Sequence, residues 1–229
     1  MIRLFDNFFP ANVFAGITDR SVNFERPPQT SGLTESQQKF LLKQGVDLLK
    51  ITHIRQVHGK RVVFDSERRT GIEDADGLAT DRPEIPLMIR VADCLPVFVY
   101  DLKTKASALI HAGWRGTKEQ ISLEALKVFK EKFHSDIKDI RVGLGPSIRS
   151  CCYEVGQEFQ EMFPRETVQR SQMFFFDLSQ ANKNQLIDAG ILKEHIADSA
   201  TCTCCDQRFF SYRREGKAAG RMLALIKVS

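Results

Sequence analysis

The clearest pattern along the chain is a series of short apolar runs, most of them between residues 51 and 115. Each run is rich in β-branched and aromatic residues and is bounded by polar or turn-forming residues, which is typical of strands rather than helices. The predicted strands cover 60–65, 85–91, 95–101, 106–110 and 140–145.

Two helices are predicted from capping boxes, in which a threonine is followed three residues later by a glutamine. Thr34 and Gln37 begin a helix that should end near Gly45. Thr117 and Gln120 begin another directly after the fourth predicted strand, so this part of the chain forms a strand, a tight turn and a helix. The apolar face of this second helix has helical spacing and comprises Ile121, Ala125, Phe129 and Phe133.

Further helices are predicted in the second half of the chain. The apolar face of one comprises Val155, Phe159 and Phe163. That helix should stop at Pro164, and a weaker helical pattern over 178–189 is closed by Gly190 as a C-terminal cap. The prolines, glycine and hydroxyl residues of 25–36 indicate a surface loop.

Strands and helices thus alternate irregularly, which favours a mixed α/β or α+β fold and argues against a regular doubly wound one. Of the two we expect α+β, with helices packed outside mixed β-sheets. The chain has 229 residues and carries neither an internal repeat nor a flexible linker that would divide it. A chain of this length buries roughly 70% of its unfolded surface, enough for a sizeable core. We therefore predict a single domain over residues 1–229.

The charge balance narrows the class of partner. Lys plus Arg number 33 and Asp plus Glu 29, so the formal net charge is 33 − 29 = +4. There is no Lys/Arg block of the kind that nucleic-acid-binding proteins use, and no apolar run of the roughly 20 residues that a membrane span needs. We expect a small-molecule partner, with neither nucleic acid nor membrane, and a monomer or homodimer. Because the N-terminal segment breaks its apolar stretch with Arg3, Asp6 and Asn7, we predict a reducing, cytoplasmic location.

Six cysteines occur in the chain, and five of them fall into two short clusters. Cys151 and Cys152 form one cluster, and Cys202, Cys204 and Cys205 form the other. A reducing compartment and the adjacency of these cysteines favour free thiols or metal ligands over disulfides. Because a second pair at zinc-ribbon spacing is missing, we expect the clustered cysteines to be small buried packing residues, with structural zinc as the alternative.

Three segments each place one metal-ligating side chain beside small or turn-forming residues. The ligands are His58 in QVHG, Cys94 in ADCLP and His111 in HAGW. Two histidines and one cysteine are an accepted set for catalytic zinc, which keeps one open position. The alternatives are buried, hydrogen-bonded histidines with a small core cysteine, or a Cys–His nucleophile pair.

The turn after the strand at 106–110 has the composition of an anion site. Gly113 and Gly116 permit close approach of a ligand, Arg115 supplies a planar fork of donors, and the helix expected to start near Thr117 presents free N–H groups. Trp114 could stack on a flat ring or fill a gap in the core. The alternative for the whole segment is a tight turn with Arg115 paired to a surface carboxylate.

A second basic segment lies near the C-terminus. Arg213, Arg214 and Arg221 surround a tyrosine in FFSYRREGKAAGR, residues 209–221. These residues fit either the lining of an anionic pocket or a solvated basic turn.

Six motifs occur in one order along the chain: QVHG at 56–59, ADG at 75–77, ADCLPV at 92–97, HAGWRGT at 111–117, GPSI with CCYEVG at 145–156, and FFSYRREG at 209–216. Together they resemble the laccase-domain family of YfiH-like proteins, formerly described as multicopper polyphenol oxidases. The motif-bearing part of the domain spans 51–226. The resemblance implies a YfiH-like sandwich of mixed sheets.

The resemblance also implies an activity and a metal. It implies a zinc-dependent purine nucleoside phosphorylase acting on adenosine, inosine and methylthioadenosine, with adenosine deaminase activity. The implied zinc ligands are His58, Cys94 and His111, which coincide with the set found from the residues alone. Zinc is favoured over copper, and the implied partners are a nucleoside and phosphate.

Roles for the remaining candidates follow from the chemistry of these reactions. Arg115, Gly116 and Thr117 are the predicted phosphate cradle, and Trp114 and Gln56 are further predicted substrate contacts. Asp76 follows an acidic loop at 73–76 and would hydrogen-bond ribose or protonate the base; its alternative role is to stabilise a turn. Cys94, Asp76 and Arg115 are accordingly the predicted catalytic residues.

Two rival functions are carried forward. A copper-dependent phenol oxidase needs about ten ligands, mostly histidine, whereas this chain has five histidines in all. A cysteine hydrolase or amidase acting on cell-wall precursors would use Cys94 as nucleophile and His111 or His58 as base.

Overall fold

The computed structural model describes residues 1–25, 33–52, 54–64 and 73–228. Its largest unit is a mixed sheet in the order β12-β8-β6-β7-β4-β3, here called the large sheet. The strands of the large sheet are β3 (Val62–Phe64), β4 (Gly77–Thr80), β6 (Leu95–Asp101), β7 (Ser107–Ala112), β8 (Ile140–Leu144) and β12 (Ile196–Asp198). Pairing is antiparallel in the middle and parallel in the two outer pairs, β3 with β4 and β12 with β8.

A second, small sheet unites the two ends of the chain. It is ordered β1-β2-β13-β5 and consists of β1 (Ile2–Arg3), β2 (Val13–Ile17), β13 (Met222–Val228) and β5 (Leu87–Val91). The predicted strand at 85–91 is confirmed in its second part by β5, whereas β2 and β13 were not predicted. Six of the seven residues of β13 are buried, so this strand lacks the alternation of polar and apolar residues that identifies a strand.

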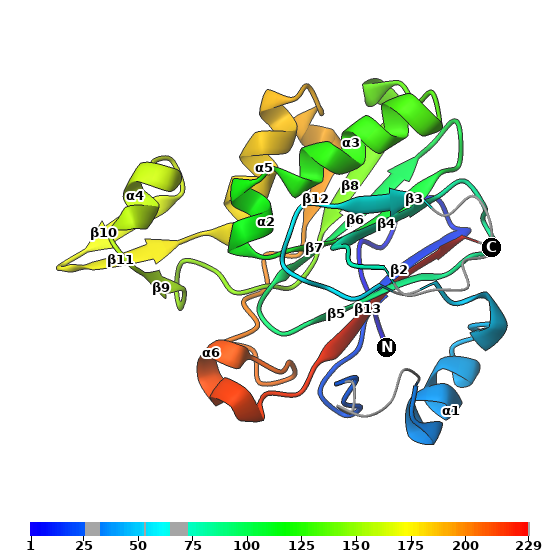
Figure 1. Ribbon diagram of the computed structural model, residues 1–229, viewed down its shortest axis with the longest axis horizontal. Coiled ribbons are helices and arrows are strands. Elements are labelled where there is room, and N and C mark those ends of the chain that lie inside the picture. Colours follow the sequence, from blue (N-terminus) through cyan, green and yellow to red (C-terminus); the bar gives the residue numbers. More distant parts are fainter. Residues whose placement is uncertain (26–32, 53, 65–72, 229) are drawn as a thin grey trace.

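The sheets and helices form layers (Figure 1). Helices α2 (Trp114–Lys118), α3 (Ile121–Lys132) and α5 (Leu178–Asp188) cover one face of the large sheet, and the small sheet covers the other. Strand β6 shows how: Val97 and Val99 pack into the helix-side core, whereas Phe98 and Tyr100 pack into the core between the sheets. Because successive strand residues point to opposite faces, β6 is buried on both sides. The predicted α+β single domain with helices outside mixed sheets is confirmed.

A smaller unit projects to one side of these layers (Figure 1). It contains β9 (Glu154–Val155), β10 (Thr167–Arg170), β11 (Met173–Phe176) and the short helix α4 (Glu158–Met162). The predicted helix through Val155 is therefore wrong at its start, because Val155 pairs with Phe174 in the sheet. Phe159 and Phe163 are nevertheless buried together in the helix-side core, as their spacing predicted.

The two predicted capping boxes have different outcomes. Thr34 and Gln37 cap α1 (Glu35–Lys43) reciprocally, as predicted. Thr117 is not a helix start: α2 begins after Gly113, and Gln120, with φ of 62°, separates α2 from α3. A left-handed residue cannot continue an α-helix, so the predicted single helix is two.

The other predicted elements agree closely with the structure. The strands at 95–101 and 140–145 correspond to β6 and β8, and the helix at 178–189 corresponds to α5. Residues 26–32 of the predicted surface loop, and residue 65 of the first predicted strand, lie outside the described residues. In the described part of the chain no helix combines the length and apolar character that a bilayer crossing requires.

A buried amide joins the three helices that cover the large sheet. Asn182 of α5 is fully buried and donates from Nδ2 to the Thr117 hydroxyl at 2.9 Å, while its Oδ1 accepts from the Ser122 hydroxyl at 2.7 Å. These bonds link α5 to α2 and α3, and α2 carries Trp114 and Arg115.

We predict that Asn182→Ala lowers the free energy of unfolding by about 1–3 kcal/mol, because it leaves two buried hydroxyls without their amide partner. Urea denaturation of the full chain measures this difference. Lys183→Ala, at the adjacent and partly exposed position, is the matched control. Equal unfolding free energies for the Asn182 variant and wild type would contradict the network.

Candidate active site

A single buried carboxylate lies under the proposed metal donors. Asp76, directly before β4, is fully buried and accepts backbone N–H groups from Val57 at 3.2 Å, His58 at 3.0 Å and Gly59 at 2.7 Å. Its other contact is His111 Nδ1, at 2.8 Å from Asp76 Oδ1. Burial alone would raise the pKa of Asp76, but His111 and the backbone N–H groups outweigh it and lower the pKa. Asp76 is therefore ionised.

This carboxylate fixes how the two histidines face each other. His58 has a left-handed φ of 60°, a strained value for a residue other than glycine, and three N–H donors to Asp76 hold it there. With His111 Nδ1 directed at Asp76, its Nε2 is left to face the cavity. The two imidazole rings meet edge to face with centroids 4.7 Å apart.

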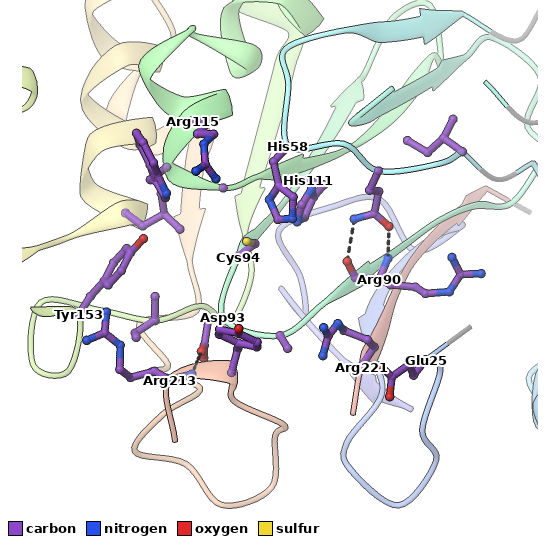
Figure 2. Close-up of a pocket in the computed structure, with 18 of the residues that line it drawn as sticks. Glu25, His58, Arg90, Asp93, Cys94, His111, Arg115, Tyr153, Arg213 and Arg221 are labelled. Atoms are coloured by element: carbon purple, nitrogen blue, oxygen red, sulfur yellow. Dashed lines mark hydrogen bonds between the residues drawn. The ribbon is translucent and has the colours of Figure 1, made fainter. Parts of the chain in front are cut away.

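Cys94 completes the group at the point where the chain passes from β5 to β6. Ligand atoms of His58, Cys94 and His111 lie within 4.8 Å of one another. A Cβ on Gly113 would come within 3.0 Å of His58 Nδ1 and 3.3 Å of Cys94 Sγ, so glycine is needed for this close approach. The structure thus brings together all three donors that the sequence analysis selected. Figure 2 shows them side by side at the centre of the cavity.

The electrostatics of these donors suit a cation. Burial would raise the pKa of Cys94, but the charge and hydrogen bond of His111 and the contact with His58 lower it to about 6. Burial would lower the pKa of His111, yet the Cys94 thiolate and Asp76 raise it to about 9. The negative charges of Cys94 and Asp76, which hold a proton on His111, would favour a metal ion in place of that proton. A thiolate and two imidazoles backed by a carboxylate are then a donor set that zinc accepts, so the residues fit a metal ion.

A second buried aspartate supports Cys94 from the other side. Asp93 is 8% exposed and has a φ of 80°. Its carboxylate accepts from the hydroxyls of Thr203 at 2.6 Å and Ser211 at 3.1 Å, and from the backbone N–H of Arg213 at 2.7 Å. The sequence analysis missed this residue, although its position beside Cys94 in ADCLP was a signal.

The donors open into a cavity of about 820 Å³. Figure 2 shows Arg115, Tyr153 and Arg213 on one side of the donors and Arg90, Arg221 and Glu25 on the other. Of the three arginines considered in the basic C-terminal segment, Arg213 and Arg221 line this cavity. Arg214 instead donates to the carbonyl groups of Thr203 and Cys204, at 3.0 and 2.8 Å.

Two of the cavity arginines rest on aromatic rings. The guanidinium carbon of Arg115 lies 4.5 Å from the centroid of the Trp114 ring, and that of Arg213 lies 5.4 Å from the Tyr153 ring. Such cation–π contacts orient a guanidinium without using its N–H groups. Arg213 also donates from Nη2 to the Glu154 carbonyl at 2.7 Å, which fixes it further, and its other N–H groups can bind an anion. Burial and the charge of Cys94 raise the pKa of Tyr153 to about 12 against the opposing effect of Arg213, so its hydroxyl remains a donor.

The remaining predicted site residues fall in different places. Gln56 lines the cavity and exchanges two hydrogen bonds of 2.8 Å with the backbone of Arg90. Gly116 and Thr117 are buried outside the cavity lining. A Cβ on Gly116 would meet the Gly59 carbonyl at 2.7 Å, so this glycine lets α2 pack against the His58 loop. The predicted cradle at a Thr117 helix start is therefore wrong, and Arg115 is its one member that lines the cavity.

Asp76 also differs from its predicted role. Its full burial and its four hydrogen-bond donors favour positioning of His58 and His111 over direct contact with a ribose or a base. The turn-stabilising alternative is closer to this arrangement.

Comparison with known proteins places the chain among relatives of similar length. The model of the family described as multi-copper polyphenol oxidoreductase laccase matches residues 25–229. A purine nucleoside phosphorylase of Clostridium acetobutylicum is 30% identical over 197 residues, which cover 81% of this chain and 80% of that protein. Adenosine deaminase RL5, from an unknown prokaryotic organism, is 31% identical over 199 residues, with coverages of 79% and 76%.

Solved structures agree with these matches. The crystal structure of YlmD from Geobacillus stearothermophilus has a TM-score of 0.85 and 28% sequence identity, covering 95% of this chain and 92% of that one. The family model, the relatives and the shared fold confirm the resemblance drawn from the six motifs. The chain belongs to the multi-copper polyphenol oxidoreductase laccase family, the YfiH-like group of enzymes.

Proposed function

We propose that the chain is a zinc-dependent purine nucleoside enzyme that cleaves adenosine, inosine and methylthioadenosine with phosphate and also deaminates adenosine. The observation that carries the proposal is the convergence of a three-donor metal site and cationic side chains on one cavity of about 820 Å³. That volume is within the range of small-molecule sites, about 300–1,000 Å³. The names of the relatives, purine nucleoside phosphorylase and adenosine deaminase, support the same conclusion.

The metal would be held by His58, Cys94 and His111, and zinc with three protein ligands keeps one position for water or substrate. A blue-copper centre uses the same donor types with a weak axial methionine, but no methionine is among the described residues that line this cavity. Zinc is therefore the better match. Bound there, it would supply the Lewis acidity that hydrolytic deamination needs at neutral pH.

In deamination, water adds to C6 of the purine and ammonia leaves, so adenosine becomes inosine. The chain's own residues would hold adenosine in the cavity beside His58, Cys94 and His111 and would supply or accept protons. The Tyr153 hydroxyl lines the same cavity and stays protonated because its pKa is raised, so it can donate a hydrogen bond to the substrate.

In phosphorolysis, a phosphate oxygen bonds to ribose C1′ while the C1′–N bond breaks and the base leaves. Arg115 and Arg213 lie on the same side of the cavity, each fixed on an aromatic ring. Two oriented guanidinium groups offset the charge of a phosphate dianion and hold it for attack. We assign the phosphate subsite to this side. Trp114 then orients Arg115, and stacking of Trp114 on the base remains a prediction.

A cysteine hydrolase remains the second candidate, because Asp76, His111 and Cys94 contact one another in series. That order matches an orienting carboxylate, a base and a nucleophile. With His111 as the base this mechanism does not need His58, whereas the metal donor set includes both histidines.

The decisive assay mixes the purified protein with adenosine, with and without phosphate, and separates the products by chromatography. We expect inosine in both cases, and adenine, hypoxanthine and ribose 1-phosphate only with phosphate, because the inosine formed is itself a proposed substrate. A chelator should abolish both reactions and added zinc should restore them, because both depend on the three-donor site.

The same experiment separates the candidates. No product at enzyme concentrations comparable to the substrate would overturn the nucleoside-enzyme proposal. Turnover of an amide substrate that survives the chelator but is lost in Cys94→Ser would establish the cysteine hydrolase instead.

Asp76→Asn should weaken zinc binding about 10- to 100-fold, because it removes the charge that orients His111 and anchors the His58 loop. Competition with a chromophoric chelator measures the affinity. Asp74→Asn is the matched control, since Asp74 is exposed and pairs with Arg55. An unchanged affinity in the Asp76 variant would remove its positioning role.

Arg115→Ala should lower kcat/KM for phosphate roughly 10- to 100-fold, because it removes a charged hydrogen-bond donor to the anion. Deamination, which uses no phosphate, should change little. Lys118→Ala, at an exposed lysine on the same helix, is the control for a general charge effect. Equal losses in both reactions would move Arg115 out of the phosphate subsite.

A further inference from the structure

Four cysteine sulfurs from two loops distant in sequence meet beside the candidate active site. The Sγ atoms of Cys151, Cys152, Cys202 and Cys205, here called the thiol cluster, lie within 4.8 Å of one another. Cys205 Sγ is 3.6 Å from Cys151 Sγ and 3.2 Å from Cys152 Sγ. Cys151 and Cys205 are exposed. The expectation that the clustered cysteines are buried packing residues is therefore wrong for these two.

We propose that the thiol cluster is a second metal site, which binds Zn²⁺ through four cysteine sulfurs. Tetrahedral zinc with Zn–S bonds of about 2.3 Å places its sulfurs about 3.8 Å apart. The two sulfur separations of 3.2 and 3.6 Å lie below that value, and no separation in the cluster exceeds 4.8 Å. Each therefore differs from the tetrahedral value by about 1 Å at most, so small movements close the cluster around an ion. Four protein donors leave no open position, which distinguishes a structural site from the three-donor site in the cavity.

The local backbone brings Cys202 and Cys205 together. These two cysteines have the C-x-x-C spacing of zinc-binding turns. The Asp206 N–H donates to the Cys202 carbonyl at 2.9 Å and closes the turn that contains them. One short segment thereby supplies two of the four sulfurs of the cluster.

The two loops are also tied together independently of the sulfurs. Ser147 and Cys202 form a parallel β-bridge, and the Thr203 N–H donates to the Ser147 carbonyl at 3.1 Å. The donors are thus prearranged, and an ion would lose little free energy in ordering them.

Positive charge near the cluster offsets the charge of the proposed complex. Four thiolates around Zn²⁺ carry a net charge of −2, which needs cations or N–H donors close by. Arg170 donates to the Ser150 carbonyl at 3.0 Å, on the loop of Cys151 and Cys152. Arg214, which is also ion-paired with Glu215, donates to the Cys204 carbonyl at 2.8 Å on the other loop. Each loop therefore has one guanidinium attached to its backbone.

The position of the cluster gives the metal a structural task. Tyr153, which lines the cavity, directly follows Cys152. Thr203, next to Cys202, donates to Asp93, which in turn precedes Cys94. Zinc in the cluster would hold both segments in place, so its role is to position one wall of the cavity and not to touch the substrate.

Metal content tests this independently of any enzyme activity. The full chain is purified under anaerobic, reducing conditions with zinc and desalted, and zinc per chain is measured by mass spectrometry. We expect wild type to hold a second equivalent of zinc, which the Cys152→Ser, Cys205→Ser double variant lacks. His58→Ala with His111→Ala should lose the other equivalent and keep this one, so failure of the cavity site and failure of the thiol cluster are told apart.

A spectroscopic measurement covers the case in which the serine variants fold poorly. Cobalt(II) loaded into the His58→Ala, His111→Ala variant should give strong thiolate-to-cobalt charge transfer and the visible bands of a tetrahedral site. Cys205→His, which replaces one zinc ligand type by another, should retain the metal with a weaker charge-transfer band.

Cys204→Ser is the matched control, because Cys204 belongs to the same loop but lies outside the group of four. It should retain both equivalents. Equal zinc in wild type and the double variant would overturn the proposal. A disulfide between Cys152 and Cys205 that persists in protein purified under the reducing conditions would do the same. So would a Cys204 variant that loses as much zinc as Cys205→Ser, since the ligand set would then be a different one.

Discussion

The arrangement of the active site depends on the burial of one charge. A carboxylate taken out of water is costly unless hydrogen-bond donors surround it, and Asp76 meets four of them. Three are successive backbone N–H groups of the His58 loop and the fourth is the ring of His111. Neither histidine can therefore move without leaving a buried charge partly unpaired. The cost of burying a single charge thus fixes the positions of two candidate metal donors, His58 and His111.

The sheet topology brings the third donor to the same place. Strands β6 and β7 are antiparallel with Pro96 opposite His111, so the start of β6 and the end of β7 share one edge of the large sheet. Cys94 directly precedes β6, where the chain arrives from the small sheet. In the segment between β5 and β6, Asp93 itself has a left-handed backbone, and the hydrogen bonds of its carboxylate hold it there. Asp76 does the same for His58. Each of these two strained positions, His58 and Asp93, is thus stabilised by the hydrogen bonds of a buried aspartate.

Local patterns predicted much of the fold, because strands such as β6 and β8 and the cap of α1 are specified by residues close together in sequence. The strands that were missed, β2 and β13, owe their structure to partners far along the chain: Ala224 pairs with Ile17 on one side and Ile89 on the other. The break between α2 and α3 was missed for a related reason. Helix α2 is fixed by the packing of Gly116 against the Gly59 carbonyl and of Thr117 against Asn182. The sequence of 117–120 alone cannot predict those contacts, because the partners are distant along the chain.

The same distinction separates the site residues that could be predicted from those that could not. His58, Cys94, His111 and Arg115 carry side chains whose chemistry identifies them one at a time. Asp93 and Tyr153 matter through what they contact, and those contacts span 110 residues for Asp93 and Thr203. The predicted phosphate cradle rested on a helix start, yet Thr117 is buried, and the cations at the cavity are instead aimed by aromatic rings. In the proposed phosphate subsite, anion recognition would therefore be a property of side-chain pairs. The positive charge stays beside His58, Cys94 and His111 only while Trp114 and Tyr153 keep their own packing.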